Sequence, residues 1–185
     1  MDYLARTWRQ PDEGIWEVRG GPQHFVHSKV MAWVAFDRVA KEITADESSE
    51  PRWRTLANEI HAEVCERGFG RELNSFVRAY GSKRLDASLL LIPLVGFLPA
   101  TDPRVQGTLR AIEDRLLIGG EFVLRYEAEN PADGMPPGEG AFLACSFWLA
   151  DNYVLQGRMR KPANYSSDCS PGGTTWACLR MKWIL

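Results

Sequence analysis

Apolar residues recur three and four positions apart through several long stretches of the chain, which is the spacing of one face of a helix. The predicted helices cover residues 1–9, 28–43, 50–66, 87–98, 103–117 and 141–155. Ser28 and Asp86 are expected to cap two of them, and Pro103 takes the first helical position of a third. Residues 75–80 and 122–126 predict only short strands. Because no long strands alternate with the helices, the predicted fold class is mainly α.

Long loops rich in glycine and proline separate these helices. Residues 10–26 hold two prolines and three glycines, and residues 130–140 hold three of each. Loops of this length inside a compact domain are usually functional, so we expect substrate contacts there. After Gly157 the helical spacing stops. We therefore predict one domain at residues 1–157 and an aberrant, disordered tail at residues 158–185.

The composition of the chain excludes several classes of binding partner. The 185 residues carry 22 Lys+Arg against 24 Asp+Glu, a formal net charge of −2, which gives no electrostatic reason to bind nucleic acid or an anionic membrane. No apolar run approaches the roughly 18 to 20 residues that span a bilayer. The first ten residues lack the apolar core of a secretory signal, and the four cysteines have no framework spacing. A cytoplasmic protein with reduced thiols is expected.

Aromatic residues are abundant, with seven Trp, five Tyr and eight Phe. The C–H faces of a sugar ring stack well on indole, while the sugar hydroxyls need charged or polar partners. Trp near carboxylates therefore suits a carbohydrate site. Trp is also a large core residue, and most of the seven are expected in the core.

The first chemical candidate is an acidic loop. Asp12, Glu13 and Glu17 lie within six positions, beside Trp16 and shortly before Arg19. Close carboxylates repel one another, and desolvation against Trp16 would raise the pKa of at least one, as a general acid requires. An exposed acidic loop without a catalytic role is the alternative.

The second candidate is the segment from His24 to Lys29. His24 and His27 are three apart, but no Cys or carboxylate completes a tetrahedral set at a familiar spacing. Capping or hydroxyl-binding roles at a helix start are therefore favoured over a metal site. Lys29 in a first helical turn opposes the helix dipole, which favours a polar partner such as a carboxylate across the site. A solvated lysine is the alternative.

The third candidate combines Arg125 with the glycine-rich segment around Glu139. No Lys-Ser/Thr follows these glycines, and an acidic residue among them would repel phosphate, so nucleotide binding is set aside. Glu139 is either an ordinary acidic residue at a helix start or a ligand for sugar hydroxyls. Cys145, inside an apolar helix, is expected to be inert.

Several blocks of the chain, taken in order, resemble one family. The blocks are residues 11–22, 24–25, 27–33, 80–82, 85–88, 138–142 and 148–150. They resemble the bacterial branch of glycoside hydrolase family 15, which contains glucoamylase-like enzymes and some trehalases. The resemblance covers residues 1–157. It implies an incomplete (α/α)6 toroid of paired helices with short β-hairpins in its loops, and no cofactor.

The resemblance also implies roles for individual residues. Glu17, after the Ile-Trp pair, would be the general acid of an inverting hydrolase that cleaves an α-glucoside such as trehalose or a maltooligosaccharide. Around the non-reducing-end glucose it places Trp16, Arg19, His27, Lys29, Arg125 and Glu139. Inversion needs a second carboxylate as the base that activates water.

The chain departs from the family pattern twice. Nothing precedes Met1, so the usual N-terminal sandwich and first toroid helices are expected to be missing. No Glu follows Glu139, so the usual base near the C-terminus is absent from the chain. Because Met and Trp have single codons, the DNA of residues 181–184 is largely fixed, and one shifted frame of it encodes Glu, then Val or Met, then Asp. This resembles the base region of the family, so we hypothesise a frameshift after about Arg160.

These departures predict impaired hydrolysis by this chain. The alternative is a non-catalytic carbohydrate-binding or vestigial fragment. Apolar faces that the missing toroid helices would cover should be exposed in this chain, and self-association through these faces is expected.

Overall fold

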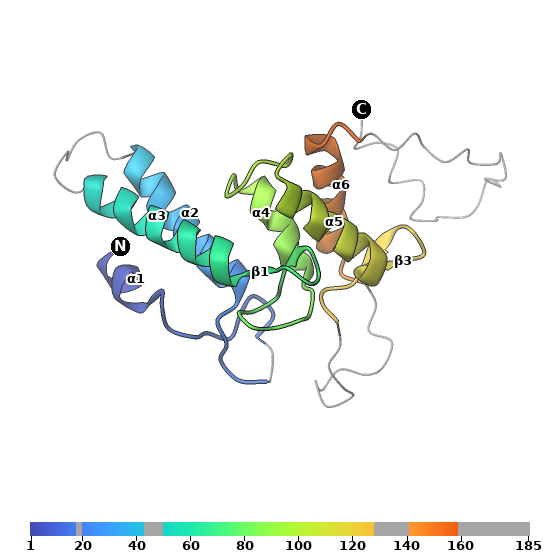
Figure 1. Cartoon of the computed structure of the whole chain (residues 1–185), viewed down its shortest axis with the longest axis horizontal. Helices are drawn as coiled ribbons and strands as arrows, with labels where there is room; N and C mark the ends of the chain where they lie inside the picture. The colour runs from blue at the N-terminus through green and yellow to red at the C-terminus, as the bar shows by residue number, and fades with distance from the viewer. Residues whose placement is uncertain (18–19, 43–49, 128–140, 159–185) are drawn as a thin grey trace, which may run out of the picture.

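The computed structural model describes residues 1–17, 20–42, 50–127 and 141–158, and helices dominate it (Figure 1). The α-helices are α1 (Asp2–Thr7), α2 (Val26–Glu42), α3 (Glu50–Arg67), α4 (Leu91–Leu94), α5 (Pro103–Leu116) and α6 (Leu143–Leu155), with a 3-10 helix η1 (Ala87–Leu90). Two antiparallel hairpins pair β1 (Phe69–Gly70) with β2 (Ser75–Phe76) and β3 (Leu117–Ile118) with β4 (Phe122–Val123). The prediction of a mainly α fold with short hairpins is confirmed.

Helices α2 and α3 lie side by side along one half of the described structure (Figure 1). Their facing sides bury apolar residues at helical spacing, among them Trp33, Phe36, Ile60 and Val64. The rings of Phe36 and Trp53 stack with their centroids 5.7 Å apart. Burial of this shared face stabilises both helices, because most helical stability in proteins comes from the packing of an apolar face.

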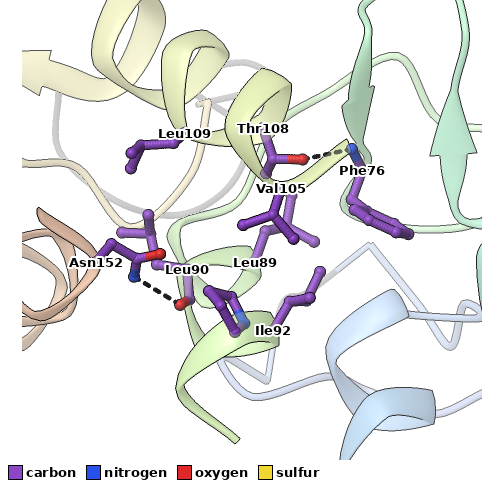
Figure 2. A pocket seen from close by; sticks show the side chains of 9 residues that line it. Phe76, Leu89, Leu90, Ile92, Val105, Thr108, Leu109 and Asn152 are labelled. Carbon is purple, nitrogen blue, oxygen red and sulfur yellow. Dashed lines mark hydrogen bonds between the residues drawn. The ribbon is translucent and has the colours of Figure 1, made fainter. Parts of the chain in front are cut away.

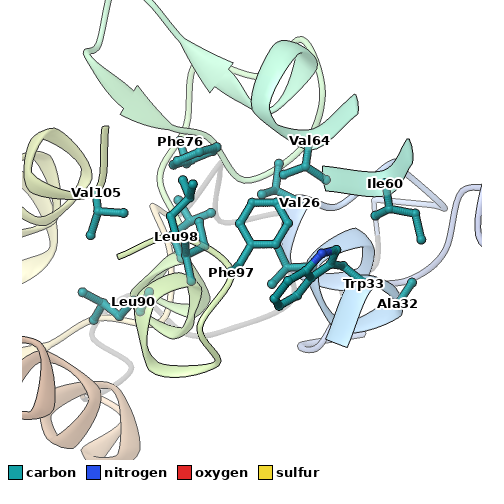
Figure 3. Close-up of a cluster of buried hydrophobic side chains, with 14 of the residues drawn as sticks. Val26, Ala32, Trp33, Ile60, Val64, Phe76, Leu90, Phe97, Leu98 and Val105 are labelled. Carbon is teal, nitrogen blue, oxygen red and sulfur yellow. The ribbon is translucent and has the colours of Figure 1, made fainter. Parts of the chain in front are cut away.

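The other half consists of η1, α4, α5 and α6, and one hydrophobic core joins it to the first half (Figure 3). Phe97, which follows α4, lies against Trp33 of α2 in an edge-to-face contact with ring centroids 5.0 Å apart. Phe76 and Val105 lie on the other side of this cluster. The two halves therefore share side-chain packing and do not form separate cores.

Side chains from η1, α5 and α6 line a small space in the interior (Figure 2). Its lining leaves no room for a water molecule. The Thr108 hydroxyl accepts a hydrogen bond from the Phe76 N–H at 2.9 Å, and the Asn152 amide donates one to the Leu90 carbonyl at 2.9 Å. These two polar side chains join α5 to β2 and α6 to η1, and this space is core packing and not a ligand site.

The sequence predicted two helix starts correctly, those of η1 and α5. Asp86 caps η1 by accepting a hydrogen bond from the Ser88 N–H at 2.8 Å. Asp102 caps α5 in the same way, through the Arg104 N–H, and Pro103 occupies the first turn of that helix. Both arrangements follow from the preference of carboxylates for orphan N–H groups at a helix start.

Two helix predictions were wrong. Helix α2 begins at Val26, two residues before the expected cap, and the Ser28 hydroxyl donates to the Asp12 carboxylate at 2.7 Å. Residues 87–98 do not form one helix, because η1 gives way to the single turn α4. Pro93 has no N–H to donate and crowds the preceding turn, and Gly96 turns the chain with φ +79°.

None of the helices in the described ranges combines the length and apolar content that a bilayer crossing requires.

Candidate functional site

The loop before α2 is joined to the start of η1 by a contact between Trp16 and Asp86. The indole Nε1 of Trp16 lies 3.0 Å from each carboxylate oxygen of Asp86, a residue 70 positions later in the chain. The Asp86 side chain is buried. Burial raises the pKa of Asp86, and the hydrogen bonds from Ser88 and Trp16 oppose the rise.

The ring of Trp16 lies where three segments meet. Phe142 contacts it edge-on with centroids 5.7 Å apart, and Trp148 of α6 lies 6.2 Å away. The guanidinium of Arg125 is 5.7 Å from the ring centroid, within reach of a cation–π attraction. The structure thus brings Trp16 and Arg125, two predicted site residues, into contact.

Glu17 follows Trp16 in a left-handed backbone conformation with φ +47°. Such a conformation costs a residue with a Cβ roughly 1–2 kcal/mol, and outliers of this kind cluster at functional sites. Its side chain is exposed. The carboxylate that Trp16 contacts is Asp86, so the expected shielding of a carboxylate by this indole occurs there and not within the acidic loop.

An open groove of about 390 Å³ lies between α1, the loop and α2. It is lined by Leu4, Gly14, Ile15, His27, Ser28, Met31 and Ala32. His27 is half-buried, and burial lowers its pKa while the charges of Asp86 and Asp12 oppose the shift. Asp12 shapes the groove, since its carboxylate accepts hydrogen bonds from the Ser28 hydroxyl and the Gly14 N–H, both at 2.7 Å. The groove therefore places His27 beside the loop that carries Glu17.

Lys29 lies in the interior with 2% of its surface exposed. Its ammonium donates to the carbonyls of Trp8 at 2.5 Å and Gln10 at 2.6 Å. The partners of the Lys29 ammonium are thus backbone carbonyls and not the carboxylate that the sequence predicted. The alternative prediction, a lysine exposed to solvent, is wrong as well. In this structure Lys29 holds the segment after α1 against α2.

Arg19 and Glu139 lie outside the described residues, as does the predicted tail from residue 159 onward. Cys145 is buried, and burial raises the pKa of its thiol to about 12, with the nearby Asp86 charge adding to the rise. A thiol that stays protonated is a poor nucleophile, in agreement with the predicted inert cysteine.

Sequence reasoning missed two residues of this region. Asp86 was recognised only as a helix cap, because its second partner is Trp16, far away in sequence. Arg78 is buried, with its guanidinium 4.8 Å from the Tyr126 ring and 5.5 Å from the Phe25 ring, and its charge favours the ionised form of Asp86. A buried arginine has no local signature, so no pattern could have found it.

Solved structures share the fold of this chain. A wild-type glycosidase superposes with a TM-score of 0.73 at 22% identity, covering 85% of this chain and 41% of that chain. A variant glycosidase in complex with glucose matches with the same score, identity and coverage. The chain therefore shares the fold of part of these (α/α)6-type structures.

Residues 1–167 match the model of Glycosyl hydrolases family 15, and the chain belongs to that family. It is 49% identical over 161 residues to the trehalase of Mycobacterium tuberculosis (strain ATCC 25618 / H37Rv), covering 86% of this chain and 23% of that protein. It is 41% identical over 164 residues to the trehalase of Thermoplasma volcanium, covering 87% of this chain and 26% of that protein. The chain thus spans about a quarter of the length of these relatives.

Proposed function

We propose that this chain is part of an inverting α-glucosidase that acts on trehalose, with Glu17 as the general acid. The observation that carries the proposal is the strained turn of Glu17 next to the anchored Trp16, beside Arg125 and His27. The two trehalase relatives support trehalose over maltooligosaccharides as the substrate.

In the proposed reaction the Glu17 carboxyl donates its proton to the glycosidic oxygen as the bond from that oxygen to the anomeric carbon breaks. Water attacks the same carbon from the opposite face and gives its proton to a second carboxylate. Trp16, His27 and Arg125 would contact the terminal glucose, with Arg19 and Glu139 as further proposed contacts. Lys29, the remaining residue that the resemblance implies, is bonded in the interior to the carbonyls of Trp8 and Gln10 instead. Since the chain holds no Glu after Glu139, we propose that the chain alone lacks the base and hydrolyses slowly.

The test compares Glu17→Gln with the matched control Glu13→Gln, a change in the same loop. Loss of general acid help usually costs about 100- to 10,000-fold in rate. We expect trehalose hydrolysis to fall by that factor in Glu17→Gln and to stay near wild type in Glu13→Gln. Equal rates in all three proteins would refute the role of Glu17. Binding of trehalose without turnover in any of them would favour the carbohydrate-binding alternative.

We also propose that the chain self-associates through the exposed side of α6. Leu143, Phe147 and Val154 lie on one face of this helix and are 50%, 58% and 62% exposed. Phe147→Ser should lower the sedimentation coefficient toward that of a monomer, whereas Tyr3→Ser, at a distant exposed position, should not. A wild-type chain that sediments as a monomer at high concentration refutes this proposal.

The frameshift after about Arg160, the domain limit at residue 157 and the cytoplasmic location remain proposals from the sequence. Sequencing the locus across the codon of Arg160 and translating the downstream frames tests the frameshift. A downstream frame without the Phe-Pro-Gln-rich block typical of the family would contradict it.

A further inference from the structure

The geometry points to Asp86 as a positioning residue that acts through Trp16 to hold the turn of Glu17. The consequence for catalysis rests on the proposed function, whereas the positioning itself is a property of the fold. Asp86 does not belong to the acidic loop and lies 70 positions after Trp16.

Contacts other than the one with the Trp16 indole also hold the Asp86 carboxylate in place. It caps η1 through the Ser88 N–H at 2.8 Å, and it is 2% exposed, so its rotamer is held by the helix start and by burial. Both oxygens then face the Trp16 N–H at 3.0 Å. A hydrogen bond to a buried carboxylate is among the stronger kinds, and removing the donor leaves the acceptor unpaired.

Neighbouring side chains also hold the Trp16 indole ring in place. Phe142, Trp148 and Arg125 surround it at centroid distances of 5.7, 6.2 and 5.7 Å. A tryptophan has only two side-chain torsions, so a fixed ring fixes the position of its own Cα. The Cα of Glu17 is the next one along, about 3.8 Å away across a trans peptide.

The turn itself restrains Glu17 only weakly. The Glu17 N–H donates to the Gly14 carbonyl at 3.4 Å, beyond the usual range for such a bond. The left-handed conformation of Glu17 is unfavourable for a residue with a side chain, so it persists only when its surroundings hold it. The anchor of Trp16 on Asp86 supplies that restraint one residue away.

The test follows Glu17 directly, by two-dimensional NMR of the 15N-labelled chain. The Trp16 indole signal is assigned by its loss in Trp16→Phe. In Asp86→Asn one acceptor oxygen must serve the donors of both Ser88 and Trp16, so we expect the indole N–H to shift and exchange faster and the Glu17 amide signal to shift or broaden. The matched control Asp114→Asn, at an exposed helical position, should change neither.

Trp16→Phe removes the N–H donor but keeps an aromatic ring, and it should displace the Glu17 amide signal as Asp86→Asn does. The double variant should add little to either single change, because both break the same contact. A Glu17 amide that stays in place in Trp16→Phe overturns the inference, and this arm decides the question even if Asp86→Asn does not fold.

Measurements of trehalose hydrolysis distinguish a failure of this inference from a failure of the proposed function. With the acid displaced, kcat should fall about 10- to 100-fold in Asp86→Asn with little change in KM, since misplacement of about 1 Å can cost that much. A wild-type chain that neither binds nor hydrolyses trehalose would refute the proposed function and leave the NMR result to decide the positioning. A moved Glu17 amide with unchanged kcat would overturn the catalytic part alone.

Discussion

The ammonium of Lys29 donates a hydrogen bond to the carbonyl oxygen of Trp8 across 21 positions of sequence, in the interior of the protein. A second bond to the Gln10 carbonyl completes a link between α2 and the segment after α1. A buried charge is stable only where polar groups replace water around it, and here backbone carbonyls do so.

Lys29→Met should therefore destabilise the fold, because it leaves two carbonyls without their donor. A buried group that loses its partner costs about 1–3 kcal/mol in free energy of unfolding. Urea unfolding measures this, with Lys41→Met on the exposed side of α2 as the control, expected within about 0.5 kcal/mol of wild type. Weaker trehalose binding with unchanged stability would instead support the glucose contact that the family resemblance implied.

The lowered pKa of His27 predicts loss of stability in mild acid. Because burial lowers the folded pKa below the ordinary value of 6.5, the unfolded chain binds the proton more tightly. This contribution to stability is complete above pH 6.5 and is lost as the pH falls through the folded pKa. Urea unfolding between pH 7.5 and 5 should show a smaller loss of stability in His27→Gln than in wild type. Asp86 and Asp12, the charges that face His27, are present in both proteins. Parallel pH dependences would contradict the assignment.

Gly107 of α5 lies against the backbone of Asn74. A Cβ built on it would come 2.0 Å from the Asn74 carbonyl oxygen, and Asn74 itself is held at φ +48°. In an ordinary helix interior, Gly→Ala stabilises by about 1 kcal/mol. Here Gly107→Ala should destabilise, by about 1–3 kcal/mol, as overpacked positions do. Thermal unfolding checks the sign, and Arg110→Ala on the exposed face of α5 should shift the midpoint little. A more stable Gly107→Ala would show that this contact relaxes freely.

Phe97 joins the two halves of the core through Trp33 (Figure 3). Truncation of a buried Phe to Ala costs about 3–5 kcal/mol through lost burial and the cavity left behind. We expect Phe97→Ala to lower the free energy of unfolding by that amount. Tyr3→Ala, at a side chain that is 74% exposed, should cost far less. A cost below about 1 kcal/mol for Phe97→Ala would mean that the halves do not depend on this contact.

The sequence by itself determined the helical class, most helix positions, the cap at Asp86, the helix start at Pro103, and the family blocks that the comparison with family 15 confirmed. These features depend on residues within a few positions of one another, where periodicity and capping act. The Trp16–Asp86 anchor and the burial of Lys29 required the folded chain, because their partners lie 70 and about 20 positions away. Packing brings such residues together, and no local sequence pattern indicates which carbonyl or carboxylate a side chain will contact.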